Sequence, residues 1–200
     1  MSEAFVAGLV LAAGGSRRMG RPKQLLPFGG ATLLDHTVAN ARACDFDQLI
    51  VALGGDAGKV RARVDLSGTQ VVINPGFGAG CSSSIAVAMG ALDLDATALV
   101  LMLGDQPGVT PAIVRVLLAA RGDAPIAVCR YDDGRGHPFA FDHTMFEELR
   151  SLHGDKAVWR MLDERADEVE EVPVAGRVPL DIDTWADYEA VVAASGRSSA

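Results

Sequence analysis

A glycine-rich, basic stretch near the start of the chain has the residue types that bind a polyphosphate. Its sequence is Leu11-Ala12-Ala13-Gly14-Gly15-Ser16-Arg17-Arg18-Met19-Gly20-Arg21-Pro22-Lys23. Gly14 and Gly15 lack side chains, so phosphate oxygens can approach the backbone and meet converging N–H groups. Arg18 and Lys23 supply full charges that neutralise part of a polyphosphate. The pattern predicts a triphosphate-binding loop, and a surface loop with solvated arginines is the simpler alternative.

The spacing of the glycines argues against two better-known nucleotide loops. Gly15 and Gly20 match the glycines of GxxxxGK[ST], but Arg21 and Pro22 follow where that motif requires Lys and Ser or Thr. The dinucleotide pattern GxGxxG is missing as well, because the glycine pair that opens the loop is adjacent. The loop is therefore neither a Walker A motif nor an NAD fingerprint.

Aspartates in two distant segments are the predicted metal ligands. Asp105 follows the most hydrophobic stretch of the chain, Ala98 to Leu103, while Asp181 and Asp183 are two residues apart and point to one side of an extended segment. Mg²⁺ prefers oxygen ligands and bridges one or two carboxylates to substrate phosphates. We expect Asp105 and one of the other two to bind Mg²⁺. The alternatives are a turn role for Asp105 and, for Asp183, a carboxylate at the N-terminus of the helix that follows.

A second candidate binding segment combines a flexible loop with serines at the start of a helix. It is Asn74-Pro75-Gly76-Phe77-Gly78-Ala79-Gly80-Cys81-Ser82-Ser83-Ser84. Hydroxyl and N–H groups at a helix N-terminus suit the edge of a base or an anion, and we also expect one serine to cap the helix. The segment misses the GxSxG nucleophile motif because Ser84 stands at the final glycine. A serine hydrolase is therefore disfavoured.

Alternating strands and helices position these segments. The predicted strands are Phe5 to Leu11, Leu49 to Leu53, Val71 to Ile73, Ala98 to Leu103 and Ile126 to Cys129, mostly without alternation of polar residues. Helical spacing occurs around Leu33 to Ala41, Ile113 to Leu118, Ser82 to Leu92 and Thr184 to Ala194. This order predicts a three-layer α/β/α, Rossmann-like fold with a mainly parallel sheet, covered on both faces. Loops at the carboxyl ends of such strands bind ligands, which is where the glycine-rich loop and Asp105 fall.

The regular alternation weakens after about Tyr131. A turn cluster over 132–136 precedes a short predicted strand, His137 to Phe141, and one or two helices within Phe146 to Leu162. We expect 131–165 to form an excursion from the main fold. The acidic segment 163–171 is predicted to be solvated, 172–174 to be a late strand and 195–200 to be a frayed tail.

Composition limits the class of protein. The 200 residues are 49% hydrophobic and 22% charged, which is typical of one globular domain spanning 1–200. The longest apolar run is far shorter than the roughly 20 residues that cross a bilayer, and no basic signal-peptide start is present. Three widely spaced cysteines indicate reduced thiols, and a net charge of −8 argues against nucleic acid or anionic membrane as partners. The expected location is the cytoplasm.

Several of these motifs, in this order, resemble one enzyme family. The chain is similar to the NTP-transferase-like domain of the nucleotidyltransferases related to the molybdenum cofactor cytidylyltransferase and guanylyltransferase. The matching motifs are LVLAAGGSRRMGRPKQLLPFGGATLLDHTV, Asn74-Pro75 with Gly80 to Ser84, Gly104-Asp105-Gln106-Pro107, Gly136-His137-Pro138 and Asp181-Ile182-Asp183-Thr184. The resemblance covers nearly the whole chain.

The resemblance implies roles for most candidate residues. Nucleotide binding falls to Leu11, Ala12, Ala13, Gly14, Gly15, Ser16, Arg18, Lys23, Asn74, Gly80, Ser82 and Ser83. Asp183 is the more natural second metal ligand beside Asp105, with Asp181 still open, and the region around His137 covers the acceptor. An imidazole there could hydrogen-bond an acceptor phosphate or pterin, or it could be a structural turn residue.

The implied reaction is attack of a substrate phosphate on the α-phosphorus of a nucleoside triphosphate, which releases pyrophosphate. No side chain has to protonate the leaving group, so positioning and charge neutralisation by Mg²⁺, Arg18, Lys23 and backbone N–H groups suffice, without a covalent enzyme intermediate. Ala12-Ala13-Gly14 resembles the cytidylyltransferase branch, which implies CTP and a molybdopterin acceptor, with a molybdoenzyme as a possible recipient of the product. The alternatives are a guanylyltransferase acting on molybdopterin or another small phosphorylated metabolite, and a non-catalytic cofactor carrier.

Overall fold

A seven-stranded sheet forms the centre of the molecule, seen in a computed structural model that describes residues 4–16 and 18–197. Its strands are β1 (Val6–Ala12), β4 (Gln48–Leu53), β5 (Gln70–Ile73), β6 (Ala98–Leu103), β7 (Ile126–Tyr131), β8 (Gly134–Asp142) and β9 (Val169–Pro173). Their order is β5-β4-β1-β6-β8-β7-β9. Only β8 runs against its neighbours among these seven strands. The predicted mainly parallel sheet is confirmed.

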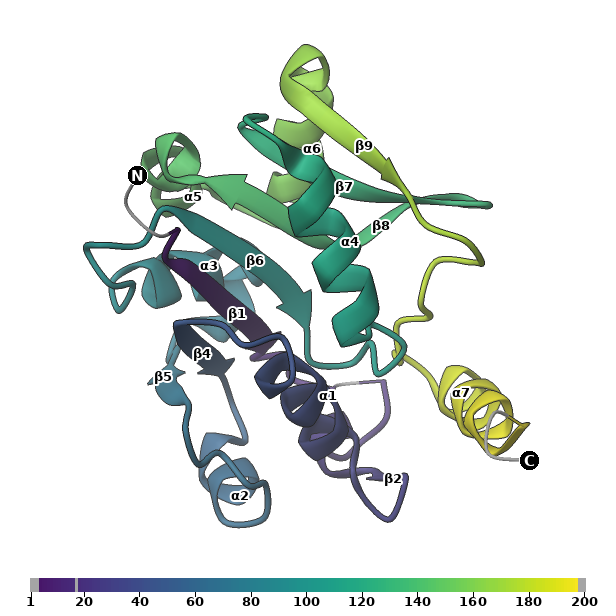
Figure 1. The fold of residues 1–200 in the computed structure, drawn as a ribbon. Coiled ribbons are helices and arrows are strands. Elements are labelled where there is room, and N and C mark those ends of the chain that lie inside the picture. The colour runs from purple at the N-terminus through teal and green to yellow at the C-terminus, as the bar shows by residue number, and fades with distance from the viewer. Residues whose placement is uncertain (1–3, 17, 198–200) are drawn as a thin grey trace.

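Helices cover both faces of the sheet (Figure 1). One face packs against α1 (Leu33–Arg42), α2 (Ala57–Arg61) and α4 (Pro111–Arg121). The other packs against α3 (Cys81–Met89), α5 (Phe146–Ser151) and α6 (Ala157–Glu164). The predicted three-layer α/β/α architecture is therefore confirmed.

Smaller elements complete the described chain. A two-stranded hairpin pairs β2 (Pro27–Phe28) with β3 (Ala31–Thr32), and α7 (Trp185–Arg197) is the last helix. The single turns of 3₁₀ helix are η1 (Lys23–Leu25), η2 (Phe77–Ala79), η3 (His143–Met145) and η4 (Ala166–Glu168). Among residues 4–16 and 18–197, no helix combines the length and the apolar character needed to cross a lipid bilayer.

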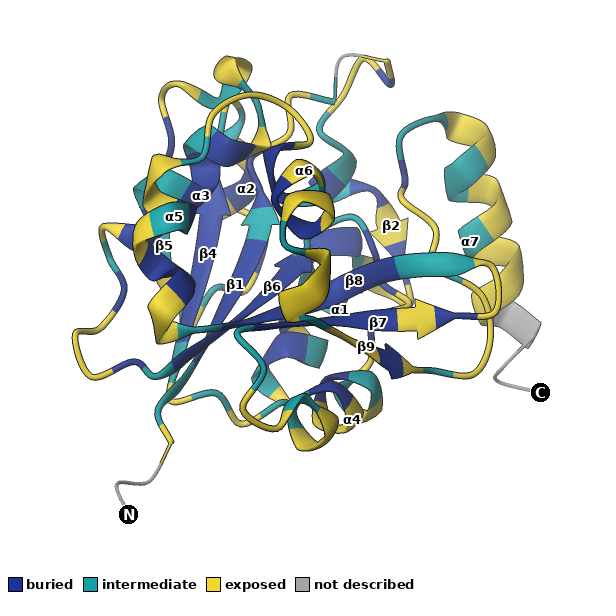
Figure 2. Ribbon diagram, turned by 90° about the horizontal axis from the view of Figure 1, so that it is seen from above, coloured by how far each residue is buried: buried dark blue, intermediate teal, exposed yellow. Residues whose placement is uncertain are grey.

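Burial on both faces explains why the strands lack polar alternation. Successive residues of β1 enter opposite cores: Leu9 joins the cluster of Ile85 on α3, whereas Val10 joins the cluster of Leu34 on α1. Figure 2 shows the central strands as mostly buried between partly exposed helices. A strand with apolar neighbours above and below needs apolar residues at every position, which is the pattern found in the sequence.

The second half of the chain differs from the expected excursion over 131–165. The segment β8 lies inside the main sheet between β6 and β7, because Phe139, Ala140 and Phe141 are fully buried and fill both cores. The expected turn over 132–136 is correspondingly shorter, since β8 begins at Gly134. After β8 the chain returns as α5 and α6 across the face that also holds α3, and the loop between these two helices borders the functional pocket described below.

Two predictions near the C-terminus are wrong in part. The acidic segment 163–171 is largely exposed, as predicted, but the late strand expected over 172–174 is β9, an edge strand that begins at Val169. The prediction missed Val169, which packs against the core on one face of the sheet while Val172 is buried in the core on the other face. The expected tail over 195–200 begins too early as well, since α7 continues to Arg197, and 198–200 lie outside the described residues.

The loops that follow β4, β1 and β6 meet at the carboxyl edge of the sheet. The backbone N–H of Gly104 donates to the carbonyl of Leu11 over 2.8 Å. A side chain at Gly54 would overlap the carbonyl oxygen of Ala13, and one at Gly104 would lie 2.8 Å from the Cβ of Ala12. Glycine is therefore needed at Gly54 and Gly104 by close backbone approach, and these contacts fix the position of the loop after β1.

We predict that Gly54→Ala destabilises the protein. The added methyl group must push the loop after β1 away, and overpacking of this kind lowers the free energy of unfolding by about 1–3 kcal/mol. Denaturant unfolding measures the change. Gly58→Ala is the matched control, because Gly58 is exposed on α2 with no atom within 4 Å of an added Cβ. Equal stability of the two variants would contradict the prediction.

Candidate functional site

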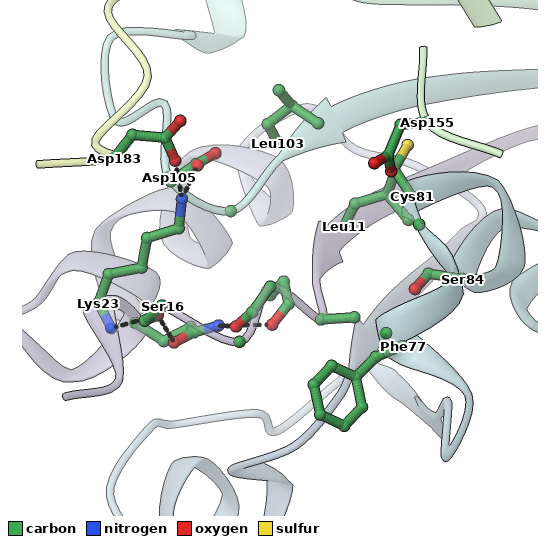
Figure 3. Close-up of a pocket in the computed structure, with 18 of the residues that line it drawn as sticks. Leu11, Ser16, Lys23, Phe77, Cys81, Ser84, Leu103, Asp105, Asp155 and Asp183 are labelled. Atoms are coloured by element: carbon green, nitrogen blue, oxygen red, sulfur yellow. Dashed lines mark hydrogen bonds and ion pairs between the residues drawn. The ribbon is translucent and has the colours of Figure 1, made fainter. Parts of the chain in front are cut away.

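A cavity of about 460 Å³ opens at the carboxyl ends of β1 and β6. Its walls are the loop after β1, the segment from Phe77 to Ser84, the loop after β6, and the isolated residues Asp155 and Asp183 (Figure 3). The predicted site residues that line it are Leu11, Ala12, Ala13, Gly14, Gly15, Ser16, Arg18, Lys23, Gly80, Asp105 and Asp183. The structure thus gathers most of the candidates around one cavity, although Arg17 lies outside the described residues.

Lys23 joins the two candidate metal ligands. Its Nζ donates to a carboxylate oxygen of Asp105 and, over 2.9 Å, to Oδ1 of Asp183. Arg18 donates from Nη2 to the other oxygen of Asp183 over 2.8 Å. The Lys23 and Asp105 side chains are only 12% and 17% exposed, so solvent screens their ion pair less than one at the surface. Two cations and two carboxylates from three distant segments therefore form one cluster.

Within this cluster the pKa values of Lys23 and Asp183 shift in opposite directions. Burial acts to lower the pKa of Lys23, but the charges and hydrogen bonds of Asp105 and Asp183 outweigh it and the pKa is raised. Burial acts to raise the pKa of Asp183, but its bonds with Lys23 and Arg18 lower it. Both shifts favour the charged forms, so Lys23 carries its positive charge and Asp183 its negative charge at neutral pH.

A buried glutamine shapes the loop that carries Lys23. Gln24 donates from Nε2 to the carbonyls of Ala12, over 2.8 Å, and Gly14, over 3.0 Å. The hydroxyl of Ser16 accepts from the Lys23 N–H over 2.9 Å. These bonds hold the two ends of the loop together and aim Lys23 into the cavity. Sequence reasoning missed Gln24, because nothing in its spacing distinguishes it from a solvated residue.

Asp183 is held in place from both sides of the chain. Thr184 and Asp187 cap α7 reciprocally: Asp187 Oδ2 accepts from the Thr184 N–H over 2.7 Å, and Thr184 Oγ1 accepts from the Asp187 N–H over 3.3 Å. Ile182 is fully buried in a small cluster with Met19 and its neighbours. The capping role considered for Asp183 is thus filled by other residues, and its carboxylate faces Lys23.

Asp181 does not line the cavity, although it lies close to the cluster. Its pKa is raised to about 6, first by loss of solvation and then by the negative charges of Asp105 and Asp183. The sequence did not decide whether Asp181 or Asp183 is the second metal ligand. In the structure Asp183 contacts Lys23, whereas Asp181 lies beside the site.

The predicted base-reading segment is built differently from the expectation. Asn74 is buried and donates to the hydroxyls of Ser83, over 2.8 Å, and Ser84, over 2.9 Å, while its Oδ1 accepts from the Gly76 N–H. Asn74, Ser82 and Ser83 do not line the cavity. The expected serine cap of the helix is wrong, because Gly80 is the N-cap residue of α3 and the Ser83 hydroxyl instead donates to the Gly80 carbonyl.

Other residues of this segment form the cavity wall. Phe77, Cys81 and Ser84 line it together with Gly80. The sequence pattern assigned Phe77 no role. The exposure of these wall residues to the cavity depends on the turn at η2, which spacing alone does not reveal.

His137 does not reach the cavity. It lies within β8, is 8% exposed, and stacks on Phe139 with ring centroids 4.0 Å apart. Burial lowers its pKa to about 3, so the ring is neutral. The structure therefore places the expected acceptor-binding histidine in the core, because the surrounding segment is a central strand rather than an irregular cover.

The donor set of the cluster suits a hard divalent cation. Asp105 and Asp183 direct oxygen atoms at one ammonium group, so both carboxylates can face one cation. Within residues 4–16 and 18–197 no group of three or more His, Cys, Asp or Glu could hold a metal ion. Two carboxylates with the remaining positions open to phosphate oxygens and water is the arrangement that Mg²⁺ favours.

Comparison with known proteins shows the family. The sequence profile of the MobA-like NTP transferase domain matches residues 8–169. The chain belongs to this family. The resemblance found in the sequence is confirmed, and this MobA-like protein is an enzyme of the nucleotidyltransferase class.

Individual relatives match most of the chain. The crystal structure of the Mycobacterium tuberculosis Rv0371c homologue from Mycobacterium sp. strain JC1 is 50% identical with a TM-score of 0.90, covering 96% of this chain and 97% of that one. Rv0371c from M. tuberculosis H37Rv in complex with manganese is 47% identical with a TM-score of 0.86, covering 95% and 99%. Nicotine blue oxidoreductase of Paenarthrobacter nicotinovorans is 32% identical over 145 residues, which is 68% of this chain and 71% of that protein.

We predict that Gln24→Ala loosens the nucleotide loop of this MobA-like enzyme. The buried carbonyl of Ala12 and the partly buried carbonyl of Gly14 lose their donor, which lowers the free energy of unfolding by about 1–3 kcal/mol and weakens nucleotide binding. Denaturant unfolding and titration calorimetry with a nucleoside triphosphate measure the two effects. Gln48→Ala is the control, since Gln48 also donates to a backbone carbonyl, that of Ala91, but does not line the cavity. Unchanged nucleotide binding in Gln24→Ala would refute the assigned role.

Proposed function

We propose that this enzyme is a Mg²⁺-dependent cytidylyltransferase that transfers CMP from CTP to molybdopterin and releases pyrophosphate. The observation that carries the proposal is the contact of Lys23 with Asp105 and Asp183 beside a glycine-rich loop. Cationic groups for a triphosphate and oxygen ligands for a divalent ion thus face the same cavity. Family membership supports the reaction class, and Ala12-Ala13-Gly14 supports CTP as donor.

Positioning and charge neutralisation account for the catalysis. Arg18 and Lys23 bind the phosphates, and the backbone N–H groups of Gly14 and Gly15 approach the phosphate oxygens closely. Asp105 and Asp183 would hold the metal ion, which supplies charge neutralisation at the α-phosphate and the departing pyrophosphate. The manganese complex of the relative that is 47% identical supports a divalent metal, and Mg²⁺ is our choice for this chain.

The acceptor contributes the attacking phosphate itself. Its oxygen needs no general base when it arrives ionised, so the enzyme has only to align it with the α-phosphorus and to offset the repulsion between two anions. Arg18 is suited to this task, because its side chain is 68% exposed at the rim of the cavity while one guanidinium nitrogen stays hydrogen-bonded to Asp183. A phosphorylated small molecule such as a pterin can approach from that open side.

Three other functions compete with this one within the same fold: a guanylyltransferase, a redox enzyme and a cofactor carrier. A guanylyltransferase would use the same phosphate groups, since neither Lys23 nor Asp105 senses the base. The relative named nicotine blue oxidoreductase raises a redox function, in which the loop would bind a dinucleotide. The clustered carboxylates favour transfer over both a redox reaction and a carrier function, because neither of those needs two hard-metal ligands.

The setting proposed for the reaction is the cytoplasm. Cys44, Cys81 and Cys129 are all free thiols in the structure, as is usual in a reducing compartment. The finished dinucleotide cofactor would pass to a recipient molybdoenzyme. Nucleic acid and membrane are not proposed as partners of an enzyme with a net charge of −8.

A nucleotide panel tests the proposal. Purified enzyme, Mg²⁺ and molybdopterin are mixed with each nucleoside triphosphate in turn, and pyrophosphate release is measured. We expect release with CTP. Preferential release with GTP would establish the guanylyltransferase alternative, and tight acceptor binding without release from any nucleotide would establish the carrier.

We predict that Asp105→Asn abolishes pyrophosphate release while the fold stays intact. Loss of one metal ligand and one charge removes at least about a thousandfold of the rate. Lys23→Ala should weaken nucleotide binding more than acceptor binding, as calorimetry can determine. Circular dichroism checks folding, and Asp65→Asn is a control at an exposed ion pair away from the cavity. Near wild-type turnover of Asp105→Asn refutes the assignment of Asp105 to the metal.

A further inference from the structure

A buried glutamine links the two segments that carry the candidate metal ligands. Gln106 follows Asp105 in the loop after β6 and is only 2% exposed. Its Nε2 donates over 3.0 Å to the carbonyl of Pro179, 73 residues later, in the segment that leads to Asp183. Gln106 does not line the cavity, so any part it has in the reaction passes through other residues. Its hydrogen bond joins the loop of one carboxylate to the segment of the other.

Two further contacts lie beside this hydrogen bond. The backbone N–H of Ile182 donates over 3.3 Å to the carbonyl of Asp105. A Cβ on Gly108 would lie 3.3 Å from the Cβ of Pro179, so the backbone of the loop after β6 packs closely against that proline. The segment before Asp183 thus rests on this loop at two points, Pro179 and Ile182.

The loop after β6 is itself held by α1, so it is a fixed support for the other segment. Asn40 on α1 donates from Nδ2 to the carbonyls of Pro107, over 3.2 Å, and Val109, over 3.0 Å. The chain over 174–184, in contrast, contains no helix or strand that would order it internally. The bond of Gln106 therefore fastens an irregular segment to an anchored loop.

The other half of the Gln106 amide shows that stability alone does not explain this residue. Its Oε1 is buried and has no hydrogen-bond partner among the described residues. A buried acceptor without a partner lowers the free energy of unfolding. Methionine is similar in length and leaves no polar group unpaired, so stability alone would favour it at this position. The glutamine is better explained by the segment that its Nε2 holds in place.

A neutral anchor matters here because the other side-chain contacts of Asp183 are ionic. Its carboxylate bonds to Lys23 and Arg18, the two groups proposed to bind phosphates. In the proposed reaction the phosphates compete with Asp183 for these cations. The bond of Gln106 joins neutral groups away from the cavity wall, so a bound nucleotide leaves it in place.

We propose that Gln106 is a positioning residue, which holds the segment of Asp183 against the loop of Asp105 so that both carboxylates reach one divalent cation. This inference rests on the proposed function for the cation, whereas the packing between the two segments does not depend on it. Gln106 acts through Asp183 and touches neither the cation nor the nucleotide.

Calorimetry and hydrogen exchange of Gln106→Met test the proposal. CTP is titrated into the wild type and the variant with Mg²⁺ and, separately, with EDTA. With Mg²⁺ the variant should bind CTP about 10–100-fold more weakly, the loss typical when a partner of a metal ligand is removed, and with EDTA its affinity should change little. In the metal-free protein the Ile182 N–H should exchange faster than in the wild type. The free energy of unfolding should stay close to that of the wild type, because the variant loses one hydrogen bond together with one unpaired acceptor.

A double-mutant cycle determines whether Gln106 acts through Asp183. In the Asp183→Ala background, Gln106→Met should cause no further loss of Mg²⁺-dependent binding, because the carboxylate that Gln106 positions is gone. Gln48→Met is the matched control, since Gln48 also donates from Nε2 to a backbone carbonyl, that of Ala91, but lies at the start of β4, at the edge of the sheet opposite the cavity. This control should keep the wild-type response to Mg²⁺.

The adverse outcomes separate this inference from the proposed function. Equal losses of affinity with Mg²⁺ and with EDTA, or additive losses in the double mutant, would make Gln106 a structural residue only. Unchanged exchange of the Ile182 N–H would show that Gln106 does not hold the segment. Each of these results overturns the positioning role and leaves the transferase proposal standing. If Mg²⁺ does not strengthen CTP binding to the wild type, both proposals are overturned.

Discussion

The contact between one lysine and two carboxylates is the interaction on which the site depends. Lys23 is separated from Asp105 by 82 residues and from Asp183 by 160. They meet because β1 and β6 are neighbours in the sheet and because buried Ile182 fixes the segment before α7. The formal charges of Arg18, Lys23, Asp105 and Asp183 cancel, so this cluster alone does not attract a triphosphate. In the proposed reaction the additional positive charge comes from backbone N–H groups and from a divalent ion held by the same carboxylates.

Close backbone contacts provide the precision that such a site needs. Gly54, Gly80 and Gly104 each stand where a Cβ would meet a neighbouring segment, either the loop after β1 or the loop that carries Asp155, and residues of both these loops line the cavity. Gln24 adds hydrogen bonds inside the same loop. Rigid support of this kind holds charged groups in place before a ligand arrives, so less of the binding energy is used to order the protein.

The sequence predicted what depends on local pattern, and it failed where a residue's role depends on distant partners. The buried strands and the glycine-rich loop carry their signals within a few residues. The position of β8 does not, because its place between β6 and β7 depends on pairing with strands distant in the sequence. His137 was therefore expected at the cavity and lies in the core. Asn74 was expected to contact the nucleotide, but its amide bonds to serines nine and ten residues away and shapes the loop instead.

The fold alone does not identify the reaction. One fold can carry unrelated chemistries, as the relative named nicotine blue oxidoreductase illustrates within this family. A glycine-rich loop with Lys23 would serve a triphosphate or the pyrophosphate of a dinucleotide equally well. Asp105 and Asp183 favour the triphosphate. Hydride transfer gains nothing from two carboxylates near the phosphates, because without a metal ion the carboxylates would repel the phosphates. The proposed nucleotidyl transfer, in contrast, uses a cation held between these two carboxylates to neutralise charge on the phosphates.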